Sequence, residues 1–359
     1  MLSRIDRYIA FQFLTFFVGG LVVILTLFLA ADFVSMTRFQ APLDILLRYY
    51  TYYSPNILYQ LIPAACLIAA LFTLTNMNKA NELVALFSLG HSLARVSAPI
   101  LVLSAIISVV SFFIGDRALP VLNQKRDYVY YVEVRKKPGR YQTVKTNRIW
   151  YRSENIIFNI QSLEADMGRA QGLNMYYFDD EWNLVQLVKA KDVKFLNEKS
   201  WELANGTLTL FVSESSFPLT KPFDKKVVQV SEDIADIRAA PKTSEIMSLK
   251  DLSRFISKNK ELGLNTLRFE TDYHAKMAFA AAGFMLVLLG IPFTTKRERS
   301  GGNMVSIAIA CGLAAGYWMS FGASVSLGYN GILPPLLAAW APNFVLMGSS
   351  AYMLLKSPV

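Results

Sequence analysis

Charged residues are scarce in this chain, and the scarcity is confined to its two ends. Only 18% of the 359 residues are Asp, Glu, Lys or Arg, whereas 53% are hydrophobic. A soluble domain carries about 25% charged residues. The segment from Asp116 to Asp272 reaches that density, with 25 basic and 22 acidic residues, and only 11 basic and 5 acidic residues remain outside it. The sequence therefore predicts two membrane-embedded parts with a water-soluble part between them.

Residues typical of catalytic and metal sites are also few. The two cysteines, Cys66 and Cys311, lie within apolar runs, so no disulfide framework is expected. The two histidines, His91 and His274, lack a set of neighbours at metal-ligand spacing. No glycine-rich loop ending in Gly-Lys-Ser/Thr occurs, so ATP hydrolysis by that route is not expected. We expect a protein that is not an enzyme and that holds no metal or cofactor.

Long apolar runs without charge are what the two ends contain instead. A bilayer core takes about 20 helical residues to cross. Six runs qualify: Ile9–Ala31, Ile57–Thr75, the run between Arg95 and Asp116, the run between Lys276 and Lys296, Met304–Leu327 and Leu336–Leu355. The last two are separated at Gly328-Tyr329-Asn330-Gly331 and Pro334-Pro335, where turn chemistry favours a break. The fold class is therefore an α-helical membrane protein with six transmembrane helices.

The basic residues of the short loops and tails predict the orientation of these helices. Two of them, Arg38 and Arg48, lie on one side of the membrane. Eight lie on the other side: Arg4, Arg7, Lys79, Arg95, Lys296, Arg297, Arg299 and Lys356. Because basic loops stay in the cytoplasm, both termini are expected there and the central domain outside it. Basic helix ends also supply most of the net charge of +9, so nucleic-acid binding is not expected.

The central domain has the pattern of an antiparallel β-domain. Short runs mix β-branched, aromatic and polar residues: Asn147–Ser153, Ile156–Leu163, Leu173–Phe178, Leu184–Phe195 and Ser200–Val212. Turns are expected at Asp179-Asp180-Glu181, Asn197-Glu198-Lys199 and Asn205-Gly206. Ser248–Leu262 is expected to form a short amphipathic helix or linker. The expected organisation is residues 1–115 as three helices, 116–265 as a jellyroll-like β-domain and 266–359 as three more helices.

The cytoplasmic loop over Asn78–Ala98 contains a second kind of helix. Leu83, Leu86, Phe87 and Gly90 fall on one helical stripe behind Glu82, within a short helix expected near residues 78–92. An apolar face at this place must be covered. It either packs on its own bundle or docks a soluble partner such as an ATPase subunit.

Small and ionisable residues mark two further places. Gly312, Gly316 and Ser320 share a face of the fifth span, which allows a second helix to approach closely, within this chain or outside it. Asp32 and Arg38 lie near the outer end of the first span. Ions at such a depth either face a cavity or partner or sit among the lipid headgroups.

Taken in order, these features resemble the lipopolysaccharide-export permease family LptF/LptG, over essentially the whole chain. The motifs that carry the resemblance are Ile5-Asp6-Arg7-Tyr8-Ile9, Asn81-Glu82-Leu83-Val84-Ala85-Leu86 with Gly90, Gly290-Ile291-Pro292-Phe293, Arg299-Ser300-Gly301-Gly302-Asn303, Leu333-Pro334-Pro335 and Ala339-Trp340-Ala341-Pro342-Asn343. The first and last motifs are more similar to the LptG branch. Asp32 stands where that branch often has a basic residue.

The resemblance implies a permease subunit of an ABC transporter in the bacterial inner membrane, which serves outer-membrane biogenesis. It implies two copies of a separate LptB-type ATPase, a second, LptF-type permease, and LptC- and LptA-like periplasmic jellyroll proteins. The loop helix would couple to the ATPase through Glu82, with Leu83, Leu86 and Phe87 as apolar contacts.

The same resemblance implies where the substrate and the second permease would lie. Arg38 and Asp32 would lie near the lipid phosphates, and Phe28, Tyr317 and Phe321 near its acyl chains. Gly312, Gly316 and Ser320 would face the other permease. The alternative is a membrane-anchored periplasmic sensor or assembly protein without transport activity. An intramembrane enzyme would need a catalytic pair within the spans, and none is visible.

Overall fold

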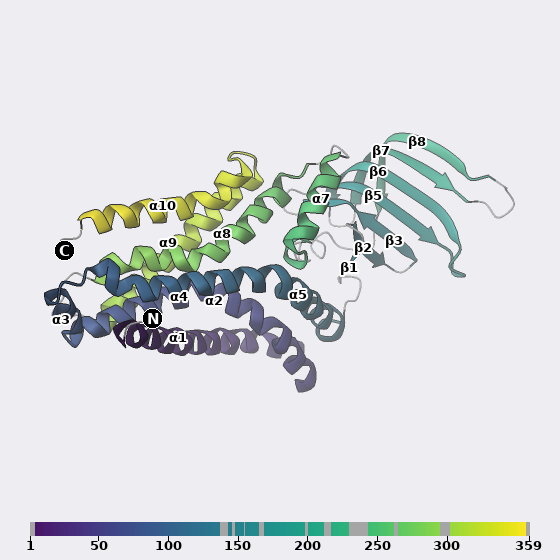
Figure 1. The fold of residues 1–359 in the computed structure, drawn as a ribbon. Coiled ribbons are helices and arrows are strands. Elements are labelled where there is room, and N and C mark those ends of the chain that lie inside the picture. The colour runs from purple at the N-terminus through teal and green to yellow at the C-terminus, as the bar shows by residue number, and fades with distance from the viewer. Residues whose placement is uncertain are drawn as a thin grey trace. The chain divides into compact units, whose positions relative to one another are not determined.

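The computed structural model describes residues 4–136, 143–145, 148–153, 155–164, 169–197, 200–211, 217–229, 243–261, 265–294 and 302–356 (Figure 1). Its α-helices are α1 (Arg4–Met36), α2 (Leu43–Lys79), α3 (Glu82–Ser88), α4 (Leu93–Phe113), α5 (Leu119–Tyr128), α7 (Leu249–Glu261), α8 (Leu267–Gly290), α9 (Gly302–Tyr329) and α10 (Pro335–Lys356). Its strands are β1 (Thr143–Lys145), β2 (Arg148–Ser153), β3 (Ile156–Ile160), β4 (Ser162–Glu164), β5 (Arg169–Phe178), β6 (Leu184–Asn197), β7 (Ser200–Leu210) and β8 (Leu219–Gln229).

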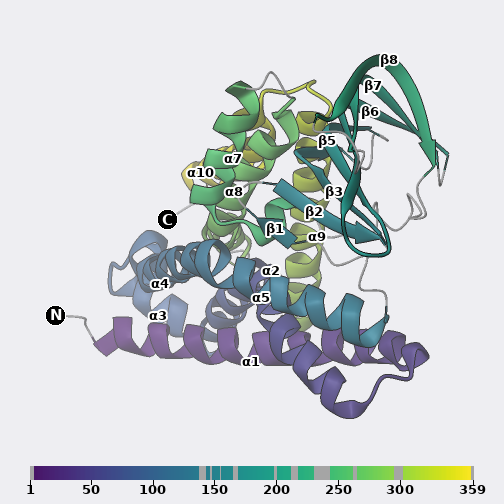
Figure 2. The ribbon, with the colours of Figure 1, turned by 90° about the vertical axis from the view of Figure 1, so that its right-hand side faces the viewer.

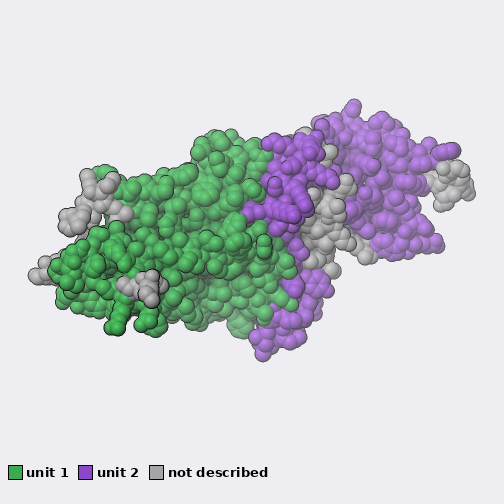
Figure 3. All heavy atoms as spheres, in the orientation of Figure 1, with its two compact units in different colours: residues 1–40, 50–122, 267–359 green, residues 41–49, 123–266 purple. Residues whose placement is uncertain are grey.

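The chain divides into two compact units, coloured separately in Figure 3. The first comprises residues 1–40, 50–122 and 267–359 and holds most of the long helices. The second comprises residues 41–49 and 123–266 and holds the β-sheet with α7. Each unit has its own hydrophobic core.

Five helical stretches within the described residues are long and apolar enough to cross a membrane: Arg4–Phe39, Leu43–Lys79, Leu93–Val134, Leu267–Thr294 and Ile307–Tyr329. They confirm a mostly helical membrane protein. The sixth predicted span is the 22-residue helix α10. The predicted break before it is also confirmed, because α9 ends at Tyr329 and α10 begins at Pro335. The basic residues Lys296, Arg297 and Arg299 lie outside the described residues. Of the motif that Arg299 begins, Gly302 and Asn303 are described and form the start of α9.

Helix α8 lies at the centre of the first unit because its small residues let other helices come close. A Cβ at Gly283 would meet Pro63 and Cys66 of α2 and Ser108 of α4, each at 3.6 Å. Such small residues are typical of helix contacts in membranes.

Polar residues of α10 and α4 attach to the backbone of α8. Asn343 Nδ2 donates to the carbonyl of Ala278 at 2.8 Å, and Ser350 Oγ donates to that of Leu288 at 2.7 Å. Ser108 Oγ accepts from the backbone N–H of Phe284 at 3.2 Å. These side chains explain how α10 can hold polar residues and still pack inside the bundle.

The β-sheet is a continuous antiparallel sheet in the order β1-β2-β3-β5-β6-β7-β8, with β4 paired to β5 (Figure 2). Alternate residues of the strands form its core, so one face is apolar. Trp201 is fully buried in this core. The rings of Phe158 and Phe195 lie edge-on to its indole, with ring centres 5.5 and 5.2 Å from that of Trp201. The inserted antiparallel β-domain predicted from the sequence is confirmed.

The strand boundaries differ from the prediction at several points. β8, β1 and β4 were not predicted, and the run Ile156–Leu163 is broken at Gln161 between β3 and β4. The turn at Asp179 is confirmed: its Oδ1 accepts the backbone N–H groups of Glu181 and Asn183 at 3.0 and 2.8 Å. Within the turn predicted at 197–199, Asn197 ends β6 and the other two residues lie outside the described ranges. The predicted amphipathic helix is α7, which buries Leu252 and Phe255.

Asn205-Gly206 is not a turn, and this prediction is wrong. Both residues lie inside β7, where Asn205 has a φ of 53° and the pairing with β6 skips one position. A Cβ at Gly206 would lie 2.3 Å from the carbonyl oxygen of Lys189 and from the ring of Phe223. The glycine is therefore required by close packing across the sheet, and the positive φ of Asn205 marks an irregularity in the strand.

Candidate functional site

A large apolar cavity lies between α1, α2 and α9 of the first unit. Its volume is about 920 Å³. It is lined by Thr15, Phe16, Gly19, Gly20, Val23, Ile24, Phe28, Tyr53, Ile57, Gln60, Leu61, Ala64, Ile68, Phe72, Ile307, Ala310, Cys311, Ala314, Ala315 and Trp318. None of these residues is Lys, Arg, His, Asp or Glu. The cavity is suited to hydrocarbon and unsuited to a charged group.

Two glycines of α1 line the cavity and leave room in it because they have no side chains. A Cβ built on Gly19 has no neighbour within 4 Å, and one on Gly20 meets only Ile68, at 3.9 Å. Polar atoms in the wall are few and partly paired. Gln60 Nε2, for example, donates to Asn56 Oδ1 at 2.6 Å. The space therefore depends on the absence of side chains at two consecutive positions of α1.

Of the residues predicted near the outer end of α1, one lines the cavity and two do not. Phe28 lines the cavity. Asp32, one turn further on, accepts a hydrogen bond from the Tyr50 hydroxyl at 3.0 Å. The guanidinium of Arg38 lies 5.0 Å from the ring centre of Phe39. The acid is thus engaged by a tyrosine of α2, and the arginine remains exposed.

Tyr317 and Phe321 of α9 do not line the cavity, and their contact with acyl chains stays a prediction. Tyr317 is only 2% exposed and does not line the cavity. Its ring stacks on that of Phe321, with 5.6 Å between the ring centres. The ring centre of Phe321 lies 5.9 Å from that of Phe279 of α8. These rings form part of the bundle core. The neighbouring Trp318 lines the cavity and was missed, because a one-residue step along a helix changes which side a residue faces.

The small-residue face of α9 is open. A Cβ at Gly312 or Gly316 would meet nothing within 4 Å, and Ser320 is exposed, its hydroxyl donating to the backbone of Tyr317. Contact with a second permease stays a prediction for these three residues.

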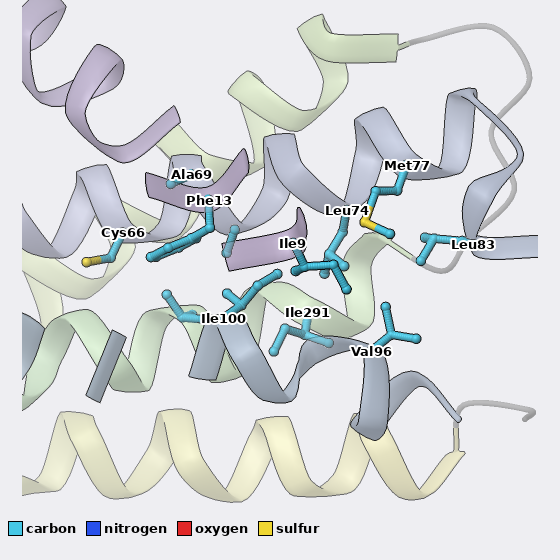
Figure 4. Packing of buried hydrophobic residues seen from close by; sticks show 12 residues of the cluster. Ile9, Phe13, Cys66, Ala69, Leu74, Met77, Leu83, Val96, Ile100 and Ile291 are labelled. Carbon is cyan, nitrogen blue, oxygen red and sulfur yellow. The ribbon is translucent and has the colours of Figure 1, made fainter. Parts of the chain in front are cut away.

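The short helix α3 has an inner and an outer apolar face. Leu83 is 2% exposed and belongs to a core cluster with Ile9 and Phe13 of α1 (Figure 4), and Leu86 packs against the same cluster. The outer face carries Val84 and Phe87, which are 52% and 40% exposed, and it is followed directly after the helix by Leu89, which is 75% exposed. Leu83 and Leu86 therefore cover their own bundle, and Val84 and Leu89 join Phe87 as the apolar side chains available outside.

Gly90 ends α3 through its backbone conformation. Its φ of +83° favours glycine, and its N–H donates to the carbonyl of Phe87 at 3.0 Å. The next N–H, that of His91, donates to the carbonyl of Leu86 at 3.1 Å. Gly90 thus has a structural reason for its place in the motif.

Polar contacts from the first turns of α1 hold the α3–α4 segment. The Tyr8 hydroxyl donates to Glu82 Oε1 at 3.0 Å and accepts from Gln12 Nε2 at 2.8 Å. Arg95, near the start of α4, donates to both oxygens of Asp6 at 2.8 and 3.0 Å. The contacts with Glu82 and Asp6 join residues 74 and 89 positions apart and were missed by sequence reasoning.

Within the described residues, no group of three or more His, Cys, Asp or Glu side chains could hold a metal ion. Two features remain as a functional site in the first unit: the apolar cavity and the outer face of α3. Helix α1 contributes to both, because it lines the cavity and contacts α3.

Two comparisons with known proteins point in the same direction. The model of the family described as lipopolysaccharide export system permease LptF/LptG matches residues 7–356. The chain is also similar to the lipopolysaccharide export system permease protein LptG of Haemophilus influenzae, at 22% identity over 256 residues. That match covers 70% of this chain and 69% of the relative.

Proposed function

We propose, since the chain belongs to the lipopolysaccharide export permease family LptF/LptG, that it is the permease subunit through which an ATPase drives lipopolysaccharide out of the inner membrane. The family and the apolar helices make it a multi-pass inner-membrane transport protein. The observation that carries the finer proposal is the large apolar cavity whose α1 wall also contacts α3.

The cavity would receive the acyl chains of the lipid. Exposing one methylene to water costs about 0.8 kcal/mol, so a lipid with several chains cannot leave the membrane unaided. Apolar walls with small residues at Gly19 and Gly20 give hydrocarbon a place outside the bilayer. Closure of the cavity would then force the lipid out, and Arg38, which follows α1 in the chain, would bind a phosphate.

The outer face of α3 would dock on a separate ATPase of the LptB type. Phe87, Val84 and Leu89 are apolar, exposed and close together in the chain, which suits a groove on a soluble protein. Glu82, at the first turn of the same helix, adds an acidic group. The ATPase supplies hydrolysis, and this chain transmits the movement.

The β-domain would pass the lipid to periplasmic jellyroll proteins of the LptC and LptA type. Its apolar face could accept acyl chains, and β8 lies at the end of the sheet order with most of its residues exposed. A strand from a partner can add to such an edge through backbone hydrogen bonds. This route requires the orientation predicted from the basic loops, with both termini in the cytoplasm and the β-domain in the periplasm.

A second, LptF-type permease would complete the transporter. The open face of α9 at Gly312 and Gly316 permits close approach of another helix, and most of the apolar side chains of α1 are exposed. A cavity bounded by two chains would enclose more of the lipid than one chain alone.

Purification from native membranes in mild detergent tests the proposal. We expect a tagged chain to bring with it an ATPase and a second multi-pass permease. Phe87→Asp combined with Val84→Asp should abolish recovery of the ATPase but keep the second permease. Trp182→Asp, at an exposed turn of the β-domain, is the matched control and should change neither. Recovery of the chain alone would instead favour the sensor or assembly alternative.

A further inference from the structure

Tyr8 lies where the cavity-lining helix contacts the proposed ATPase-docking helix. Its hydroxyl is the middle of a short chain of hydrogen bonds, in which Gln12 donates to Tyr8 and Tyr8 donates to Glu82. Among the described residues, Tyr8 is the one hydrogen-bond donor to the Glu82 carboxylate. The second oxygen, Oε2, is buried and has no partner there. Loss of the Tyr8 hydroxyl would therefore leave both carboxylate oxygens without a hydrogen bond from the described part of the chain.

The same face of α1 continues into the cavity wall. Tyr8, Gln12, Thr15 and Gly19 follow one another at intervals of three or four residues, so they share one side of the helix. Thr15 and Gly19 line the cavity. At 1.5 Å per residue, Tyr8 and Thr15 are separated by only about 10 Å along the helix axis.

We propose that Tyr8 is a positioning residue. Its hydrogen bond to Glu82 couples a movement of α3 to a movement of α1, and therefore of the cavity wall that α1 forms. When the docked ATPase displaces α3, the bond between Tyr8 and Glu82 passes that displacement to the start of α1. Leu83 of α3 and Ile9 of α1 belong to one buried apolar cluster that holds the two helices together, and the polar bond fixes their register. This inference rests on the proposed function, since it gives Glu82 a partner within the chain as well as one outside it.

Three substitutions test the hydrogen bond between Tyr8 and Glu82 while leaving the fold intact. Tyr8→Phe removes one oxygen and keeps the ring. Glu82→Ala removes the acceptor, whereas Glu82→Gln keeps an acceptor oxygen without the charge. Tyr273→Phe on α8 is the matched control, because no hydrogen bond of its hydroxyl occurs among the described residues.

The first measurement is hydrogen exchange of the α3 amides in the purified full-length permease, which needs no ATPase. One hydrogen bond to a charged group corresponds to about tenfold in an equilibrium constant. We expect Tyr8→Phe and Glu82→Ala to speed exchange by about threefold to tenfold, and the double variant to add nothing further. Tyr273→Phe should remain near the parent rate, and Glu82→Gln, which keeps a neutral hydrogen bond, should lie between the parent and Glu82→Ala. Unchanged exchange in Tyr8→Phe would overturn the proposal.

The second measurement is lipid released per ATP hydrolysed, in the complex reconstituted into vesicles. Tyr8→Phe should retain the ATPase and its hydrolysis while lipid release per ATP falls several-fold. Faster exchange with unchanged lipid release would overturn the coupling role. If the parent chain bound no ATPase, the proposed function would fail by itself, and the exchange result would still decide whether Tyr8 holds α3 on α1.

Discussion

Arg95 and Asp6 form a two-pronged ion pair that joins the beginnings of α4 and α1. Nη1 and Nη2 of the arginine lie 2.8 and 3.0 Å from the two carboxylate oxygens. The side chain of Asp6 is largely buried, whereas that of Arg95 is half exposed. Because the acid is buried, its partner cannot be removed without leaving a desolvated charge.

The first prediction concerns this pair. Arg95→Lys should lower the thermal unfolding midpoint of the purified chain by a few degrees, since a lysine cannot form both bonds at once. Arg95→Ala should lower it further. Asp6→Asn combined with Arg95→Gln should be less damaging than Arg95→Ala alone, because the buried negative charge is removed together with the arginine that balances it. Scanning fluorimetry in detergent measures all three, and equal midpoints throughout would show that the pair contributes nothing.

The second prediction fills the cavity. Gly20→Leu places a side chain into space that α1 leaves empty, where the nearest atom to a Cβ is 3.9 Å away. Lipid extraction should fall about tenfold, while ATPase recovery and fold remain intact. A tenfold loss corresponds to about 1.4 kcal/mol, which is less than the free energy gained by burying two methylenes. Photocrosslinking of lipopolysaccharide measures occupancy.

The matched control for this prediction is Gly348→Leu on α10, also a helical glycine with nothing within 4 Å of its Cβ. It lies outside the cavity lining. Equal loss in both variants would remove the cavity from the transport route.

The third prediction concerns the close packing at Gly206. Gly206→Ala forces its Cβ against a backbone carbonyl and an aromatic ring, and should destabilise the β-domain by about 1–3 kcal/mol. Asn205→Gly at the adjacent position should be tolerated, because glycine adopts a positive φ without strain. Hydrogen exchange over β6 and β7 of the full chain measures both. A stable Gly206→Ala variant would mean that β7 can move away from Lys189 of β6 and Phe223 of β8 at no cost.

The fourth prediction is a pH dependence at the Asp179 turn. Hydrogen bonds from Asn183 and Glu181 lower the pKa of Asp179 from its ordinary value of 3.8. A carboxyl whose folded pKa lies below its unfolded pKa stabilises the fold above the unfolded pKa, and this contribution is lost as pH falls through the folded value. Amide exchange in the turn, corrected for its intrinsic pH dependence, should therefore quicken below about pH 4. Asp179→Asn should remove that step.

Sequence patterns predicted the helices of this protein well because each span carries its signal within itself. The uncharged run Ile9–Ala31 lies inside α1, and the break predicted at Gly328–Gly331 begins in the last turn of α9 and ends before α10. A bilayer constrains length and polarity so strongly that composition alone indicates these elements. The strands were found where alternation was clear, as in β6.

What the sequence could not predict depends on how separate elements meet. The stripe of Leu83, Leu86 and Phe87 was found, but its division between an inner and an outer face depends on how α3 rotates against α1. The bond from Tyr8 to Glu82 spans 74 positions, and no local pattern indicates it. β8 was missed because Pro222 and its many lysines are atypical of a strand interior.

Those features of β8 affect whether two copies of the chain associate through their sheet edges. Lys221, Lys225 and Lys226 make a strand that repels a second copy of itself, and Pro222 has no N–H to offer a neighbour. Two such edges brought together would place like charges side by side, so self-association through this strand is disfavoured. A sheet with this edge is therefore less prone to aggregate, and it admits an acidic strand more readily than a basic one.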